Sequence, residues 1–204
     1  MGMHRPTLRV IERKAFLYVI PTQGVGTREI IVEFKYKEPV AGFEDGLAVL
    51  QTYHEDFVAR GDQLLKLVAN LKEQGMNEAY ANECMGTYCH YDHATFLHHQ
   101  DEERSLFPLV LGKSALIDGM IERLILDHEE IEAAWKLIAE QFKKPESITN
   151  FEALEQSTIE FEKLLRDHLT REDEDFLPQV QAILNKQQIA EAGEKMADMR
   201  HLIV

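Results

Sequence analysis

Hydrophobic and polar residues follow two different periods along this chain. Between positions 30 and 37, apolar residues alternate with mostly polar neighbours, and this period of two indicates a half-buried strand. The run from Leu8 to Ile20 is rich in branched and aromatic residues, and residues 21–27 between the two runs have the composition of a turn. We therefore predict an N-terminal β-hairpin or extended arm over residues 1–41.

After residues 39–45 the apolar residues recur at helical spacing. The predicted helices run from the mid-40s to Gly75, from an Asn77 cap to Pro108, from a Ser114 cap to residue 142, and from a Thr149/Glu152 capping box past residue 172. Four long amphipathic helices with short connections predict a mainly α protein, an antiparallel up-down-up-down four-helix bundle over residues 42–185. Residues 186–204 are predicted to form a short helical extension.

The inward stripes of the first and third helices each contain a single histidine, His54 and His128. The same stripes also predict that Val58, Leu116 and Ile125 face the core.

Composition narrows the classes of partner. The chain has 204 residues, with 22 Lys and Arg against 36 Asp and Glu, so its net charge is −14. Such a charge repels nucleic acid and acidic membrane surfaces, and we expect neither as a partner. Because the sequence has no long apolar run and no signal-peptide pattern at its start, we expect a cytoplasmic protein with one main core.

One motif occurs twice. Residues 98–108 read HHQDEERSLFP and residues 168–178 read HLTREDEDFLP, with His first, Glu at the fourth following position and Pro at the tenth in both copies. Residues four apart lie on one face of a helix, so His98 and Glu102, like His168 and Glu172, can reach one common atom. Two matching copies indicate that two helices bring the same pair of ligands to one place.

The inward stripes combine four histidines with two carboxylates. The six residues are His54, His98, Glu102, His128, His168 and Glu172. Burying a carboxylate costs several kcal/mol unless a positive charge accompanies it. No Lys or Arg falls on these stripes, so the compensating charge is predicted to be a metal. Nitrogen and oxygen ligands without thiolate suit iron, manganese or zinc, and two carboxylates can bridge a pair of ions.

The register of the first copy is a choice, because His99 and Glu103 have the same spacing as His98 and Glu102. Counting back ten residues from each proline selects His98 and leaves His99 beside the ligands or at the surface. The acidic residues around the two glutamates are then predicted to form a solvated face. These residues are Glu103, Asp173, Glu174 and Asp175.

The order and spacing of these elements resemble the hemerythrin-like, or HHE cation-binding, family. The motifs are His54-Glu55, His98-x-x-x-Glu102, His128-Glu129 and His168-x-x-x-Glu172, within residues 43–180. The resemblance implies an up-down-up-down bundle with a non-haem di-iron centre, in which the two carboxylates bridge the ions.

Oxygen-carrying hemerythrins have a second histidine one turn along the third helix, where this chain has Leu124 and Glu132. Four family-matched histidines imply an open coordination position or a place for Glu132. We therefore expect a protein that binds oxygen, nitric oxide or peroxide for scavenging, sensing or stress protection. The alternative is a di-iron redox enzyme or an iron-centre repair protein. The roles of His90, His93, Glu55 and Glu129 stay open, between supporting the ligands and facing solvent.

Overall fold

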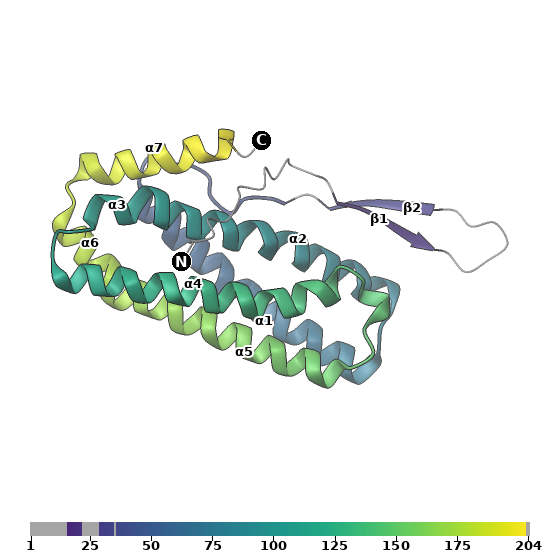
Figure 1. Cartoon of the computed structure of the whole chain (residues 1–204). Helices are drawn as coiled ribbons and strands as arrows, with labels where there is room; N and C mark the ends of the chain where they lie inside the picture. Colours follow the sequence, from purple (N-terminus) through teal and green to yellow (C-terminus); the bar gives the residue numbers. More distant parts are fainter. Residues whose placement is uncertain (1–15, 22–28, 35, 203–204) are drawn as a thin grey trace, which may run out of the picture.

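A bundle of four long helices forms the body of the protein (Figure 1). The computed structural model describes residues 16–21, 29–34 and 36–202. The long helices are α1 (Gly46–Gln74), α2 (Glu78–Asp101), α4 (Ala115–Phe142) and α5 (Phe151–Arg171). The shorter elements are the π-helices η1 (Glu102–Leu106) and η3 (Glu172–Phe176), the 3-10 helix η2 (Pro145–Ser147), and helices α3 (Phe107–Val110), α6 (Leu177–Ile183) and α7 (Lys186–Leu202).

The long helices close into one ring of contacts. Helix α1 packs against α2 and α5, and α4 packs against the same two helices, while consecutive helices run in opposite directions (Figure 1). The predicted helical bundle is therefore confirmed. Helix α7 continues the chain past α6 and packs against α1 and η1.

Polar side chains at the N-termini fix where the helices begin. Asp45, Asn77 and Ser114 each accept a hydrogen bond from a backbone N–H in the first turn of α1, α2 and α4. The predicted Thr149 cap of α5 is wrong, because Asn150 accepts from the Ala153 N–H instead. The end of α1 is as predicted: Gly75 has a φ of 75°, in the left-handed region that a glycine tolerates best.

Two strands precede the bundle. Strand β1 (Phe16–Pro21) pairs antiparallel with β2 (Glu29–Phe34), with Phe16 opposite Phe34 and Pro21 opposite Glu29. Residues 1–15 and the connection 22–28 lie outside the described residues, so the N-terminal hairpin or arm stays a prediction.

The core is built from the predicted stripes, but some residues at the edges of those stripes lie outside it. Trp135 and Phe161 are buried, whereas Val58, Leu116 and Ile125 are exposed, contrary to the prediction. An apolar stripe on a helix spans more than the surface that its neighbours cover, so residues at the stripe's margin face solvent. Across the described part of the chain, no helix combines the length and apolar character of a membrane span.

Glycines allow α7 to approach α1 closely. A Cβ atom added at Gly193 would lie 2.1 Å from the Phe43 carbonyl oxygen, and one added at Gly46 would lie 2.8 Å from Ala192 Cβ. Backbone atoms cannot move aside as a flexible side chain can. The absence of a side chain at Gly193 therefore sets how α7 sits on the bundle.

We predict that Gly193→Ala lowers the free energy of unfolding by about 1–3 kcal/mol, the usual cost of overpacking. The matched control is Gly119→Ala, on α4, where an added Cβ meets no atom within 4 Å. This control should raise stability by about 0.4–1 kcal/mol through the reduced entropy of the unfolded chain. Urea unfolding of both variants tests the pair, and an unchanged midpoint for Gly193→Ala would contradict the close approach.

Candidate metal centre

All six predicted ligands lie in the interior of the bundle. None is more than 3% exposed, and together they come from α1, from α2 with η1, from α4, and from α5 with η3. His54, His98, Glu102 and Glu172 form one cluster whose donor atoms lie within 4.8 Å of one another. Glu102 and Glu172 also form a second cluster, with His128 and His168. The two carboxylates therefore belong to both clusters.

Individual distances within the clusters are short. His54 Nε2 lies 3.1 Å from Glu172 Oε2, and His128 Nε2 lies 3.0 Å from Glu102 Oε2. Two donor atoms bonded to one ion at about 2.1 Å and at right angles would be about 3 Å apart. The spacing of these atoms therefore suits a shared ion.

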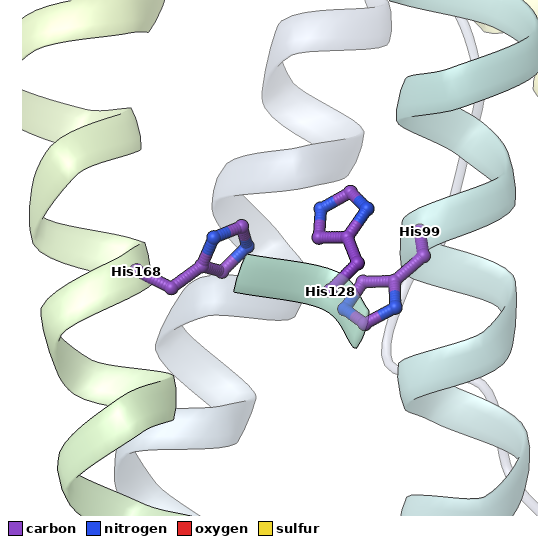
Figure 2. Close-up of side chains that lie close together, drawn as sticks. All are labelled: His99, His128 and His168. Atoms are coloured by element: carbon purple, nitrogen blue, oxygen red, sulfur yellow. The ribbon is translucent and has the colours of Figure 1, made fainter. Parts of the chain in front are cut away.

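His99 is a fifth histidine of the centre. It is 1% exposed and forms a third cluster with His128 and His168, so the expectation of a surface position is wrong. Figure 2 shows the three rings converging from α2, α4 and α5. The rings of His99 and His128 stack with centroids 3.9 Å apart and planes 8° from parallel. Five histidines therefore lie together where the resemblance implies four, and the fifth comes from α2.

The donor atoms are buried without hydrogen-bond partners among the described residues. This holds for both oxygens of Glu102 and Glu172 and for the Nε2 atoms of His54, His98, His99, His128 and His168. Buried polar atoms are satisfied in most proteins, because an unpaired one costs about 1–3 kcal/mol. So many unpaired acceptors facing one another are the signature of a cation site. The residues present therefore fit the metal that the sequence predicts.

Carboxylates hold the outer nitrogens of three rings. The Nδ1 atoms of His54, His99 and His128 lie 2.8, 3.0 and 2.8 Å from Asp173, Glu132 and Glu103, respectively. A carboxylate at Nδ1 keeps the proton on that nitrogen and leaves the Nε2 lone pair for a metal. Glu132, which the sequence offered as a possible ligand, lies at the outer nitrogen of His99 and in none of the three clusters. Asp173, Glu174 and Asp175 are exposed, as predicted, and Glu103 is half-buried, but Asp173 and Glu103 also contact histidine rings of the centre.

Each of the two glutamates, together with the acidic residue that follows it, contacts a histidine from the other half of the chain. His128 contacts Glu102 through Nε2 and Glu103 through Nδ1, and His54 contacts Glu172 and Asp173 in the same way. Each lone histidine is therefore held by consecutive acidic residues from the other half of the chain.

Both glutamates begin a π-helical turn. The N–H of Phe107 donates to the Glu102 carbonyl and that of Leu177 donates to the Glu172 carbonyl, five residues back in each case. A proline follows one residue later in both copies, and because proline has no N–H it leaves a carbonyl of the preceding turn without its usual donor. Single π turns are common at functional sites.

The remaining candidates lie outside the clusters. His90 is buried with Nε2 2.8 Å from Asp56, and His93 Nδ1 contacts the Cys89 carbonyl oxygen. Glu55 and Glu129 are exposed, which favours the solvent-facing alternative for both.

Burial perturbs the ionisation of the ligands. It raises the pKa of Glu102 well above the usual range, an effect that the nearby Glu172 carboxylate reinforces, and it lowers the pKa of His98 well below its usual range. Burial also disfavours charge on His54, but Asp173 and Glu172 outweigh it and raise the pKa of His54 to about 10. The carboxylates thus attract a positive charge, which a metal supplies once its ligands have lost their protons.

A polar network covers the His98 side of the centre. The Tyr53 hydroxyl donates to Glu38 Oε1 at 2.8 Å and accepts from Arg200 Nη2 at 3.1 Å. Arg200, on α7, also forms a two-pronged ion pair with buried Asp101, the residue before Glu102. Helix α7 is therefore tied to the sequence positions next to two ligands.

The fold and the site define a class: a helical bundle with a buried histidine and carboxylate centre for cations. The model of the hemerythrin HHE cation-binding domain matches residues 45–180. The chain therefore belongs to the hemerythrin HHE cation-binding family. A search of curated proteins found no match.

We expect Glu172→Ala to remove most of the bound metal, because Glu172 belongs to both four-residue clusters. The matched control is Glu174→Ala, two residues along the same π turn and exposed. Metal content per chain, measured by elemental analysis after purification, separates the two. Equal metal content in both variants would remove Glu172 from the ligand set.

Removing the Asp173 carboxylate, which contacts His54 Nδ1, should weaken metal binding less than removing a ligand does. We predict that Asp173→Asn weakens metal affinity by about 10–100-fold, the usual effect of losing such a partner. Asp175→Asn, at an exposed position in the same turn, should leave affinity unchanged. Competition with a chelator measures both affinities, and equal values would show that the His54 contact has no effect on the metal.

Proposed function

We propose that this protein binds two iron ions and uses them to bind oxygen, nitric oxide or peroxide. One ion would be held by His99, His128 and His168, and the other by His54 and His98, with Glu102 and Glu172 shared. The main support is the set of buried donor atoms without hydrogen-bond partners, since they would be costly in a protein that held no cation. Membership of the family supports a metal-binding function in general.

The two halves of the centre are unequal. Three histidines and two carboxylates surround one position, whereas two histidines and two carboxylates surround the other. Six ligands complete an octahedron, so the His54 and His98 side would have more open positions. Iron centres that activate small molecules keep such positions open. We therefore propose that the small molecule binds on the His54 and His98 side of the centre.

Burial limits the size of the ligand. The proposed ligand residues are at most 3% exposed, and Tyr53 and Phe57 pack against the ring of His98. A molecule of more than a few atoms could not reach the donor atoms without opening the bundle. This favours a diatomic gas or peroxide over an organic substrate.

The bound iron would supply a redox-active Lewis acid for the small ligand. The chain's own residues set its surroundings. Asp173, Glu103 and Glu132 hold protons on the outer ring nitrogens, and the apolar core around the centre excludes bulk water. Scavenging, sensing or stress protection would all follow from such a site.

Catalytic removal of peroxide or nitric oxide is the second candidate. One observation favours it over simple binding: the oxidisable ring of Tyr53 lies 5.6 Å, between centroids, from the ring of His98. Iron delivery for repair gains no such support, because the described residues enclose the centre.

The test is to measure iron, manganese and zinc in protein from iron-replete cells, and then the absorption spectrum with oxygen, nitric oxide and peroxide. We expect about two iron ions per chain. His99→Ala should lower this content, whereas Gln100→Ala, at the adjacent position, should not. A reversible oxygenated band supports a carrier, and bleaching with gas release supports an enzyme. Protein that takes up no transition metal, or whose spectrum responds to none of these ligands, contradicts the proposal.

A further inference from the structure

Two tyrosines connect the centre with the edge of the bundle. Tyr53, on α1, is fully buried, and its ring lies 5.6 Å from the ring of His98 at an interplanar angle of 36°. The hydroxyl of Tyr36 lies 3.3 Å from the hydroxyl of Tyr53. Tyr36 is only partly buried and stacks on His93, with centroids 5.2 Å apart and planes 11° from parallel. The series His98, Tyr53, Tyr36 therefore leads outward from the centre.

The hydrogen bonds along this series have a direction. Tyr53 donates its proton to Glu38 Oε1, so its oxygen is free to accept the proton of Tyr36. Arg200 donates to both the Tyr53 oxygen and Glu38, and so holds the two groups together. A phenol bonded to a carboxylate can lose an electron and its proton together, which avoids forming a buried phenol cation.

We propose that Tyr53 and Tyr36 form a relay that carries electrons from the protein surface to peroxide bound at the centre. The relay rests on the function proposed above. Peroxide is the oxidant in it, and a small thiol is the hydrogen-atom donor.

The electrons and protons of the relay balance. Tyr53 gives one electron through His98 towards the peroxide, and its hydroxyl proton passes to Glu38, which leaves a neutral tyrosyl radical. Tyr36 then transfers its hydroxyl hydrogen atom to the Tyr53 oxygen, and a thiol at the surface gives its S–H hydrogen atom to Tyr36. Glu38 releases its proton to water, and water returns one proton to the peroxide. Two turns reduce one hydrogen peroxide to two water molecules, and the two thiyl radicals couple to a disulfide.

A merely structural role for the same residues makes a different prediction. If Tyr53, Glu38 and Arg200 only fasten α7 to the bundle, oxidation of the centre would produce no radical at Tyr53. The relay and the structural role are separated by where a radical forms and how long it lasts, independently of the rate of peroxide consumption.

The experiment mixes iron-loaded protein with hydrogen peroxide, freezes it rapidly and records the electron paramagnetic resonance spectrum, with ring-deuterated tyrosine to identify the radical. The wild type should give a tyrosyl signal that decays faster when a thiol is added. Tyr53→Phe should lose the signal. Tyr36→Phe should keep a radical at Tyr53 that lasts longer and no longer responds to thiol. Tyr80→Phe, which removes a hydroxyl that donates to Gln74 near the α1–α2 connection, should behave as the wild type.

Iron content and the optical response to peroxide are measured on the same samples. If the wild type holds iron and responds to peroxide but gives no tyrosyl signal, or if Tyr53→Phe keeps the wild-type signal, the relay is overturned while the proposed function stands. If Tyr53→Phe loses iron, Tyr36→Phe becomes the deciding variant. Its radical must last longer than that of the wild type, or the relay is overturned. A protein without iron overturns both proposals.

Discussion

The cost of removing two carboxylates from water constrains the whole centre. Glu102 and Glu172 are completely buried, and among the described residues each of their ion-pair partners is a histidine. Burial disfavours the charged form of a histidine and lowers the pKa of His98, whereas Asp173 and Glu172 raise the pKa of His54. A cation between these groups would lower the cost of burying both carboxylates, so metal binding would also stabilise the fold.

The surrounding structure holds the ligands in place for that cation. The π turns at η1 and η3 start at the two glutamates, and the next acidic residue in each turn reaches the outer nitrogen of a histidine on the opposite helix. Helix α7 adds a tie from outside through Arg200 and buried Asp101. The rigid elements thus fix both the ligands and the groups that orient them, a condition that precise metal sites require.

The bundle and the gathering of six buried side chains in its interior could be predicted from the sequence, because both depend on spacing along a helix. His99 was missed as a member of the centre because it lies about 100° around the helix from His98, and spacing alone assigns it to another face. In the structure the rings of His98 and His99 are both buried, and Glu132 contacts the outer nitrogen of His99. The roles of Glu103 and Asp173 were missed for a related reason: their partners lie on other helices, and a single-helix pattern contains no information about distances between helices. The π turns have a sequence signal in the paired prolines, but a proline is also the ordinary signal of a helix end.

His54 and His128 each contact acidic residues from the other half of the chain. This exchange of partners suggests how such a centre could arise. Each half of the bundle is a helical hairpin that contributes a lone histidine and lends its acidic pair to the other half. A single hairpin would leave its lone histidine without these partners, whereas two copies related by a twofold axis would exchange them. Fusion of a symmetric homodimer through gene duplication would produce this architecture. His99, which holds the position of Leu169 in the other copy of the motif, departs from that symmetry.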